Sequence, residues 1–149
     1  MNAIILAIGA GLCWGIGEVF TKSVLHTGKV GPITAITVRS TVALPVIWLA
    51  YFVAMKVVKS EPANWTQAGA PTLLKLVLGS GLVAGAAAMI FFYSALSIGE
   101  VSRVKPVAFC LAPAVATLIG WFILGEPASA RKIGAVAMIL AGVVLLTGK

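Results

Sequence analysis

Glu18 and Lys22 are charged residues inside the first long apolar stretch of the chain. They are four residues apart, so their side chains project from one face of a helix, and Trp14 lies one turn earlier on nearly the same face. An ionisable side chain within an apolar span is costly, and it usually faces a partner or a wet cavity. This face is therefore a candidate binding or proton-coupling site, although a simple neutralising ion pair would also explain it.

Two further candidates lie in other apolar stretches. Arg39 lies about six residues into the second stretch, and Glu18 lies about seven residues before the end of the first. In two consecutive helices these side chains lie at nearly equal depth, roughly 10 Å inside the hydrocarbon edge. Tyr93 follows Phe91 and Phe92, and its hydroxyl needs a polar partner, so we expect Tyr93 to turn inward. The predicted substrate-binding residues are Trp14, Glu18, Lys22, Arg39 and Tyr93.

No catalytic or metal-binding combination of residues is present in the sequence. The single histidine, His26, ends the first apolar stretch, and no Ser/His/Asp set or phosphate-binding glycine loop is found. Cys13 and Cys110 have no metal-ligand or redox neighbours, and we interpret them as packing residues. The sequence predicts a protein that is not an enzyme, with no catalytic residue, no metal and no cofactor.

Composition places the chain in a membrane. Hydrophobic residues make up 60% and charged residues 10% of its 149 residues, whereas a soluble domain carries about 25% charged residues. The net charge is +7, but the basic residues cluster at the ends of apolar stretches, as lipid headgroups favour, and not in a nucleic-acid surface. We expect one domain, residues 1–149, with the lipid bilayer as its main surrounding.

The apolar stretches predict five membrane spans and an all-α fold. The first stretch lacks the basic start of a signal peptide and carries two charges, so we expect it to be retained. Residues 56–71 are predicted to form the longest loop, and residues 99–106 a short turn. The fold class is an all-α integral membrane protein, a bundle of about five transmembrane helices in the cell (inner) membrane. The predicted spans are Ala3–Leu25, Ile33–Ala54, Leu73–Ile98, Val107–Leu124 and Ile133–Thr147.

Small residues recur four apart in several spans, which lets helix backbones approach closely in lipid. Examples are Gly11 with Gly15 and Gly81 with Gly85. Packing within one subunit would account for most of them. The fifth span, which begins near Gly134 and has no ionisable residue, could instead mediate contact between subunits.

The basic residues give little sign of a preferred orientation. Five Lys and Arg residues fall on the N-terminal side of the membrane and four on the other, or six when Lys22 and Arg39 are added. Orientation depends on an asymmetry in this count. Both a weakly signalled single orientation and insertion of copies in both orientations are compatible with it.

Several short elements resemble, in order and spacing, the EamA-like domain of the drug/metabolite transporter superfamily. The resemblance covers nearly the whole chain and implies transport of small metabolites, often by export. Many members have ten spans, as two five-span halves in inverted orientation, and this chain resembles one half. An antiparallel homodimer would rebuild the inverted repeat. The elements are Cys13-Trp14-Gly15 with Lys22, Arg39 after Pro32, Tyr93-Ser94-Ala95-Leu96, Val104-Lys105-Pro106, Leu111-Ala112-Pro113, Leu124-Gly125-Glu126, Gly134 and Ala141-Gly142-Val143.

Two alternatives to a metabolite exporter remain. The small multidrug resistance proteins, four-span relatives built as antiparallel pairs, have their key glutamate about two turns before the lysine, where this chain has Trp14. Proton-coupled multidrug export is therefore not transferable by motif. The other alternative is a membrane scaffold, or an accessory half that needs a different subunit. For a transporter, one acid and two deep bases in each copy favour an anionic or zwitterionic substrate.

The near-equal count of basic residues predicts dual topology. Reporter fusions at Lys149 and after Lys59 should each show activity on both sides of the membrane. Adding two lysines beside Lys56 should fix one orientation and weaken homodimer function. Activity on a single side at each fusion point would contradict the prediction.

Overall fold

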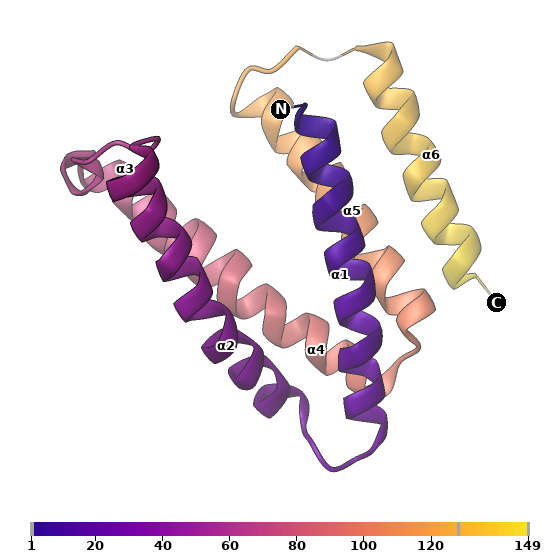
Figure 1. The fold of residues 1–149 in the computed structure, drawn as a ribbon. Coiled ribbons are helices and arrows are strands. Elements are labelled where there is room, and N and C mark those ends of the chain that lie inside the picture. Colours follow the sequence, from indigo (N-terminus) through magenta and orange to yellow (C-terminus); the bar gives the residue numbers. More distant parts are fainter. Residues whose placement is uncertain (1, 128, 149) are drawn as a thin grey trace. The chain divides into compact units, whose positions relative to one another are not determined.

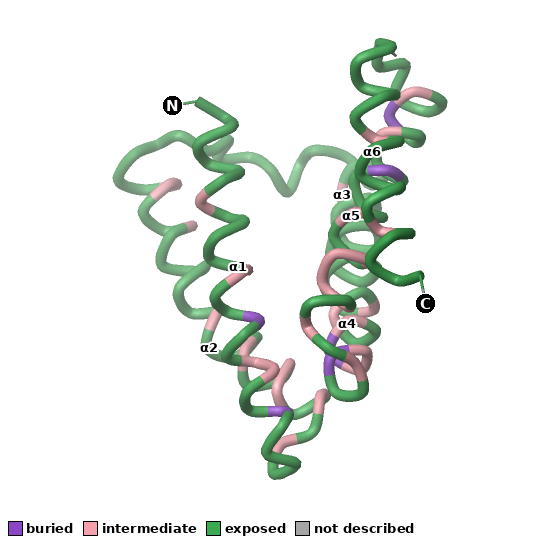
Figure 2. The backbone as a smooth tube through the Cα atoms, turned by 90° about the vertical axis from the view of Figure 1, so that its right-hand side faces the viewer, coloured by how far each residue is buried: buried purple, intermediate pink, exposed green. Residues whose placement is uncertain are grey.

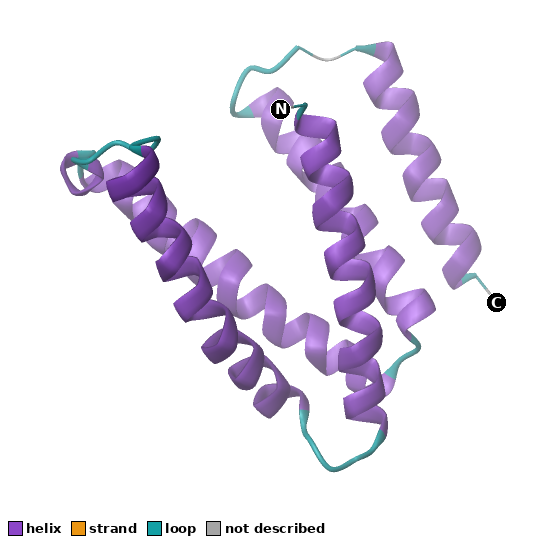
Figure 3. Cartoon of the chain, in the orientation of Figure 1, coloured by secondary structure: helices purple, strands orange, loops and turns teal. Residues whose placement is uncertain are grey.

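The computed structural model describes residues 2–127 and 129–148, and in these ranges the chain consists of helices joined by loops (Figure 3). Five helices are long and apolar enough to cross a membrane, which confirms the predicted all-α, five-span fold class. These spans are Ala3–His26, Pro32–Val58, Ala70–Ile98, Val101–Phe122 and Ala130–Thr147.

The chain divides into two compact units, Met1–Ser97 and Ile98–Lys149, and each is described by itself. The first contains α1 (Ala3–His26), α2 (Pro32–Phe52), η1 (Val53–Val58), η2 (Trp65–Gln67), α3 (Ala70–Leu74), η3 (Lys75–Ala87) and α4 (Ala88–Ile98). The second contains α5 (Val101–Phe122) and α6 (Ala130–Thr147).

The connection between α1 and α2 is short and sharply turned, so the two helices converge at this end (Figure 1). Asn2 caps the start of α1, because its side-chain oxygen accepts a hydrogen bond from the Ile4 amide at 3.1 Å. Gly28 has a φ of +67° in the loop, a conformation that glycine adopts without strain. Pro32 begins α2, where its missing N–H needs no partner.

The third span is one continuous rod made of α3, η3 and α4 (Figure 1). Its middle, η3, is a π-helix of 13 residues, although π-helical stretches are normally single turns. A β-carbon at Gly85 would lie 3.3 Å from the Ser80 carbonyl oxygen, five residues earlier in the same helix. The small residue therefore relieves crowding within the helix itself, a use that its spacing did not predict.

The fourth span begins earlier than the sequence predicted. Helix α5 starts at Val101, so the prediction of a turn over residues 99–106 is wrong beyond Glu100. Pro106 lies in the second turn of α5, where it removes the one hydrogen bond that its amide would donate to the Ser102 carbonyl group. At the other end α5 stops at Phe122, and Gly125 in the following loop has a φ of +66°.

Few side chains are buried within either unit (Figure 2). In the first unit the buried residues are Glu18, Leu25, Tyr93 and Leu96, all on α1 and α4. No described residue of α2 or α6 is buried. Apolar faces of this extent require lipid or another protein surface to cover them, so the chain is an integral, multi-pass membrane protein.

Several glycines of the small-residue stripes have no packing partner within their own unit. A β-carbon at Gly11, Gly15, Gly134 or Gly142 would meet nothing within 4 Å among the atoms that the structure describes. Packing within either unit therefore does not account for these glycines. The surfaces beside them are left for lipid, for the other unit or for a second copy.

Replacing Gly134 or Gly142 with leucine should weaken association of copies and spare ligand affinity, because α6 has no ionisable residue between Ile133 and Thr147. Overpacking a close contact costs about 1–3 kcal/mol. Crosslinking or analytical ultracentrifugation in detergent would measure association. Val144→Leu, at an exposed position of the same helix, is the control. Intact association with lost ligand affinity would contradict the prediction.

Candidate substrate-binding site

The polar centre of the first unit is Glu18, on the face of α1 that the sequence singled out. Glu18 is only 2% exposed, although most of α1 is exposed. An ionised carboxylate at this depth needs a cation or several hydrogen bonds. The groups that contact the Glu18 carboxylate therefore determine what the site can bind.

Arg39 on α2 supplies the cation. Its Nη1 atom lies 2.9 Å from Glu18 Oε1, close enough for a hydrogen-bonded ion pair. The contact agrees with the expectation that these two residues lie at nearly equal depth. Because a short loop joins α1 to α2, a pair at this level fixes the rotation of the two helices relative to each other.

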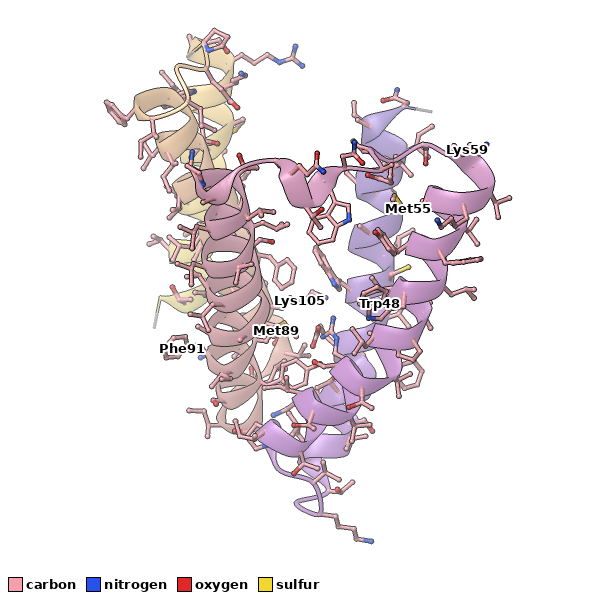
Figure 4. All side chains as sticks on the ribbon, turned by 90° about the vertical axis from the view of Figure 1, so that its left-hand side faces the viewer. Trp48, Met55, Lys59, Met89, Phe91 and Lys105 are labelled. Carbon is pink, nitrogen blue, oxygen red and sulfur yellow. The ribbon has the colours of Figure 1, made fainter. Side chains whose placement is uncertain are left out.

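Tyr93 on α4 completes a three-helix contact. Its hydroxyl oxygen accepts a hydrogen bond from Arg39 Nη1 at 2.7 Å, and the guanidinium carbon lies 5.7 Å from the ring centroid. Tyr93 is 1% exposed, whereas Phe91, two residues earlier, is 76% exposed and points away from the helix (Figure 4). Tyr93 therefore turns inward, as expected from its hydroxyl.

Lys22 has a different place from the one that the sequence suggested. Its Nζ atom donates a hydrogen bond to the Leu96 carbonyl oxygen at 2.9 Å. Leu96 lies in the last turn of α4, where carbonyl groups lack intrahelical partners and a positive charge is favourable. Lys22 thus fastens α1 to the end of α4, and it is not among the residues that line the cavity described next.

A cavity of about 480 Å³ opens beside the Glu18–Arg39 pair. Trp14, Glu18, Arg39 and Tyr93 line it, which brings together four of the five predicted site residues. The others were not predicted, although most lie within one helical turn of Glu18 or Arg39, so helical spacing from these two charges was a usable signal. They are Cys13, Gly17, Phe20, Thr21 and Val24 on α1, Val30 in the loop, and Thr34, Ala35 and Val38 on α2.

The polar groups of the cavity are only partly satisfied. Glu18 Oε2 is buried and has no hydrogen-bond partner among the described residues. Arg39 makes its described hydrogen bonds through Nη1, while a guanidinium group has five N–H donors. Glu18 and Arg39 both line the cavity, so a ligand there would lie beside a carboxylate and a guanidinium group. No group of three or more potential metal-ligating side chains occurs in the described part of the chain.

Comparison with known proteins agrees with this architecture. The model of the EamA-like transporter family matches residues 1–148. Searches of curated proteins and of solved structures gave no match. The match covers nearly every residue and confirms the resemblance seen in the sequence. The chain belongs to the EamA-like transporter family of the drug/metabolite transporter superfamily.

Proposed function

We propose that this chain is the subunit of a secondary transporter that exports a small polar metabolite across the cell (inner) membrane by alternating access. Two copies work as an antiparallel homodimer, and the substrate contacts Trp14, Glu18, Arg39 and Tyr93. The observation that carries the proposal is the cavity beside the buried Glu18–Arg39 pair within a membrane-spanning unit. Lys22 positions α1 against α4 through the Leu96 carbonyl group.

The half-satisfied carboxylate favours a transporter over a scaffold. A scaffold needs only that its buried charges neutralise each other, and the Glu18–Arg39 pair does that through one carboxylate oxygen. The second oxygen, Oε2, is buried without a donor. An unsatisfied buried acceptor is destabilising unless a ligand or a proton completes it. A cavity at the same residue gives a ligand room to do so.

The exposed helix faces support association of two copies. No described residue of α2 or α6 is buried, so both helices keep apolar surface that the chain does not cover. The family's ten-span members contain two inverted five-span halves, and this chain resembles a single half. Nearly equal numbers of basic residues on the two sides permit insertion in both orientations. A second, inverted copy would supply the missing half.

The cavity suits a zwitterion better than a simple anion or a lipophilic cation. Arg39 shares its charge with Glu18, so the excess of positive charge expected from the sequence is reduced at this site. An ammonium group of the ligand would donate the missing hydrogen bond to Glu18 Oε2. A carboxylate of the ligand would accept hydrogen bonds from the remaining N–H donors of Arg39. A guanidinium group in the cavity disfavours a multidrug cation as substrate.

Substituting Glu18 and Arg39 one at a time should show which charged group of a zwitterionic substrate each residue binds. Glu18→Gln should weaken binding of an amino acid and of its amide about tenfold or more, because both present an ammonium group, and should spare the deaminated acid. Arg39→Gln should instead weaken binding of the amino acid and of the deaminated acid, because both present a carboxylate, and should spare the amide. Binding to purified protein and uptake into proteoliposomes would measure both, with Arg39→Lys as the conservative variant. Tight binding of lipophilic cations that Glu18→Gln abolishes would reverse the assignment.

Tyr93→Phe should lower transport by about tenfold or more, because it removes the acceptor that orients Arg39 Nη1. Tyr51→Phe is a matched control. The Tyr51 hydroxyl also accepts one side-chain hydrogen bond, from Trp65 Nε1 at 2.9 Å, and Tyr51 does not line the cavity. Equal losses in the two variants would show that the Tyr93 effect is not specific to the site.

A further inference from the structure

Lys105 on α5 is a half-buried lysine whose ammonium nitrogen is enclosed, and it does not line the proposed cavity. It lies inside the span Val101–Phe122, and its side chain is labelled in Figure 4. Its ammonium nitrogen is enclosed and has no hydrogen-bond acceptor among the described residues. The nitrogen lies 5.3 Å from the centroid of the Phe109 ring, a cation–π contact. Such a contact offsets only part of the cost of removing an ammonium group from water.

The Lys105 ammonium group is enclosed and does not extend freely toward the lipid headgroups. Lys105 lies five residues after Glu100, the residue that precedes α5. A lysine this close to a span end normally extends its ammonium group toward the nearby headgroups. Here the ammonium group instead lies over Phe109, one turn further into the span. The charge therefore lies against an aromatic ring of its own helix.

No acidic side chain of the described residues forms an ion pair with Lys105. The sequence has four acidic residues. Glu18 pairs with Arg39, and Glu100 lies 3.7 Å from Arg103.

The two remaining acids lie in loops. The Glu126 carboxylate lies against Gly120, since a β-carbon there would be 3.1 Å from Glu126 Oε2. Gly120 is about 22 Å along α5 from Lys105 at 1.5 Å per residue. Glu61 is exposed in the loop between η1 and η2. No acidic side chain of this chain is therefore the counter-ion of Lys105.

We propose that Lys105 binds an anionic group from outside the chain, either a carboxylate or a phosphate. An ammonium group within a span is stable when an anion both neutralises it and accepts its hydrogen bonds. A soluble metabolite and the headgroup of an anionic lipid both present this chemistry. Lys105 and Phe109, the two residues that define the site, both belong to the second unit.

The test uses the purified full chain in nanodiscs of phosphatidylcholine. Inorganic phosphate and succinate are titrated against chloride at equal ionic strength, and thermal unfolding and calorimetry report binding. Phosphate or succinate should stabilise the wild-type protein, and Lys105→Met should weaken this binding about tenfold or more. Lys29→Met, at an exposed lysine in the loop after α1, should leave it unchanged. Without anion, Lys105→Met should be at least as stable as the wild type, because an uncompensated charge is gone.

A second arm replaces part of the phosphatidylcholine with phosphatidylglycerol and omits the soluble anions. Stabilisation that appears only in this arm and is lost in Lys105→Met would assign the anionic group to a lipid headgroup. Equal responses of wild type and Lys105→Met in both arms would overturn the proposal. If Lys105→Met does not fold, Lys105→Gln is measured in the same way, and an unaltered anion response in that variant would also overturn it.

Discussion

The free-energy cost of placing charge within apolar spans determines how the helices of the first unit are arranged. Glu18 is almost wholly buried, and the unit satisfies it by bringing Arg39 from the next helix to 2.9 Å. Lipid gives no hydrophobic drive for helices to associate, so polar contacts carry a large share of the specificity there. The same guanidinium group also reaches the Tyr93 hydroxyl. One pair of charges thus sets the relative rotation of α1, α2 and α4.

A second polar contact limits how these helices can move. Lys22 lies one turn from Glu18 and donates to the last turn of α4. Sequence reasoning treats Glu18 and Lys22 as one polar face, yet the structure gives them different partners, a guanidinium group and a backbone carbonyl group. The carbonyl group is available because α4 ends at Ile98 and leaves its last carbonyls without amides. Lys22 therefore acts as an interhelical cap.

The sequence predicts the fold class, the five spans and the inward Tyr93, because apolar length and buried polar atoms leave few choices. The sequence does not predict features that depend on details of the backbone. Helix α5 starts at Val101 and runs through Pro106, so a boundary placed at this proline misjudges where the helix begins. The π-helical winding of η3 has no signal in hydropathy. The partner of Lys22 is a carbonyl group, which every residue carries, so no residue type could have identified it.

The incompleteness of the polar contacts has a consequence for the proposed transport cycle. A fully satisfied Glu18–Arg39 pair would hold α1 and α2 in one arrangement, and no ligand would gain by entering. Because Glu18 Oε2 lacks a donor in the described chain, a ligand that supplies one stabilises the arrangement in which it binds. A ligand shifts a conformational equilibrium only through such a difference in affinity between states. The unsatisfied oxygen is therefore the group through which substrate binding would favour one state of the cycle over the other.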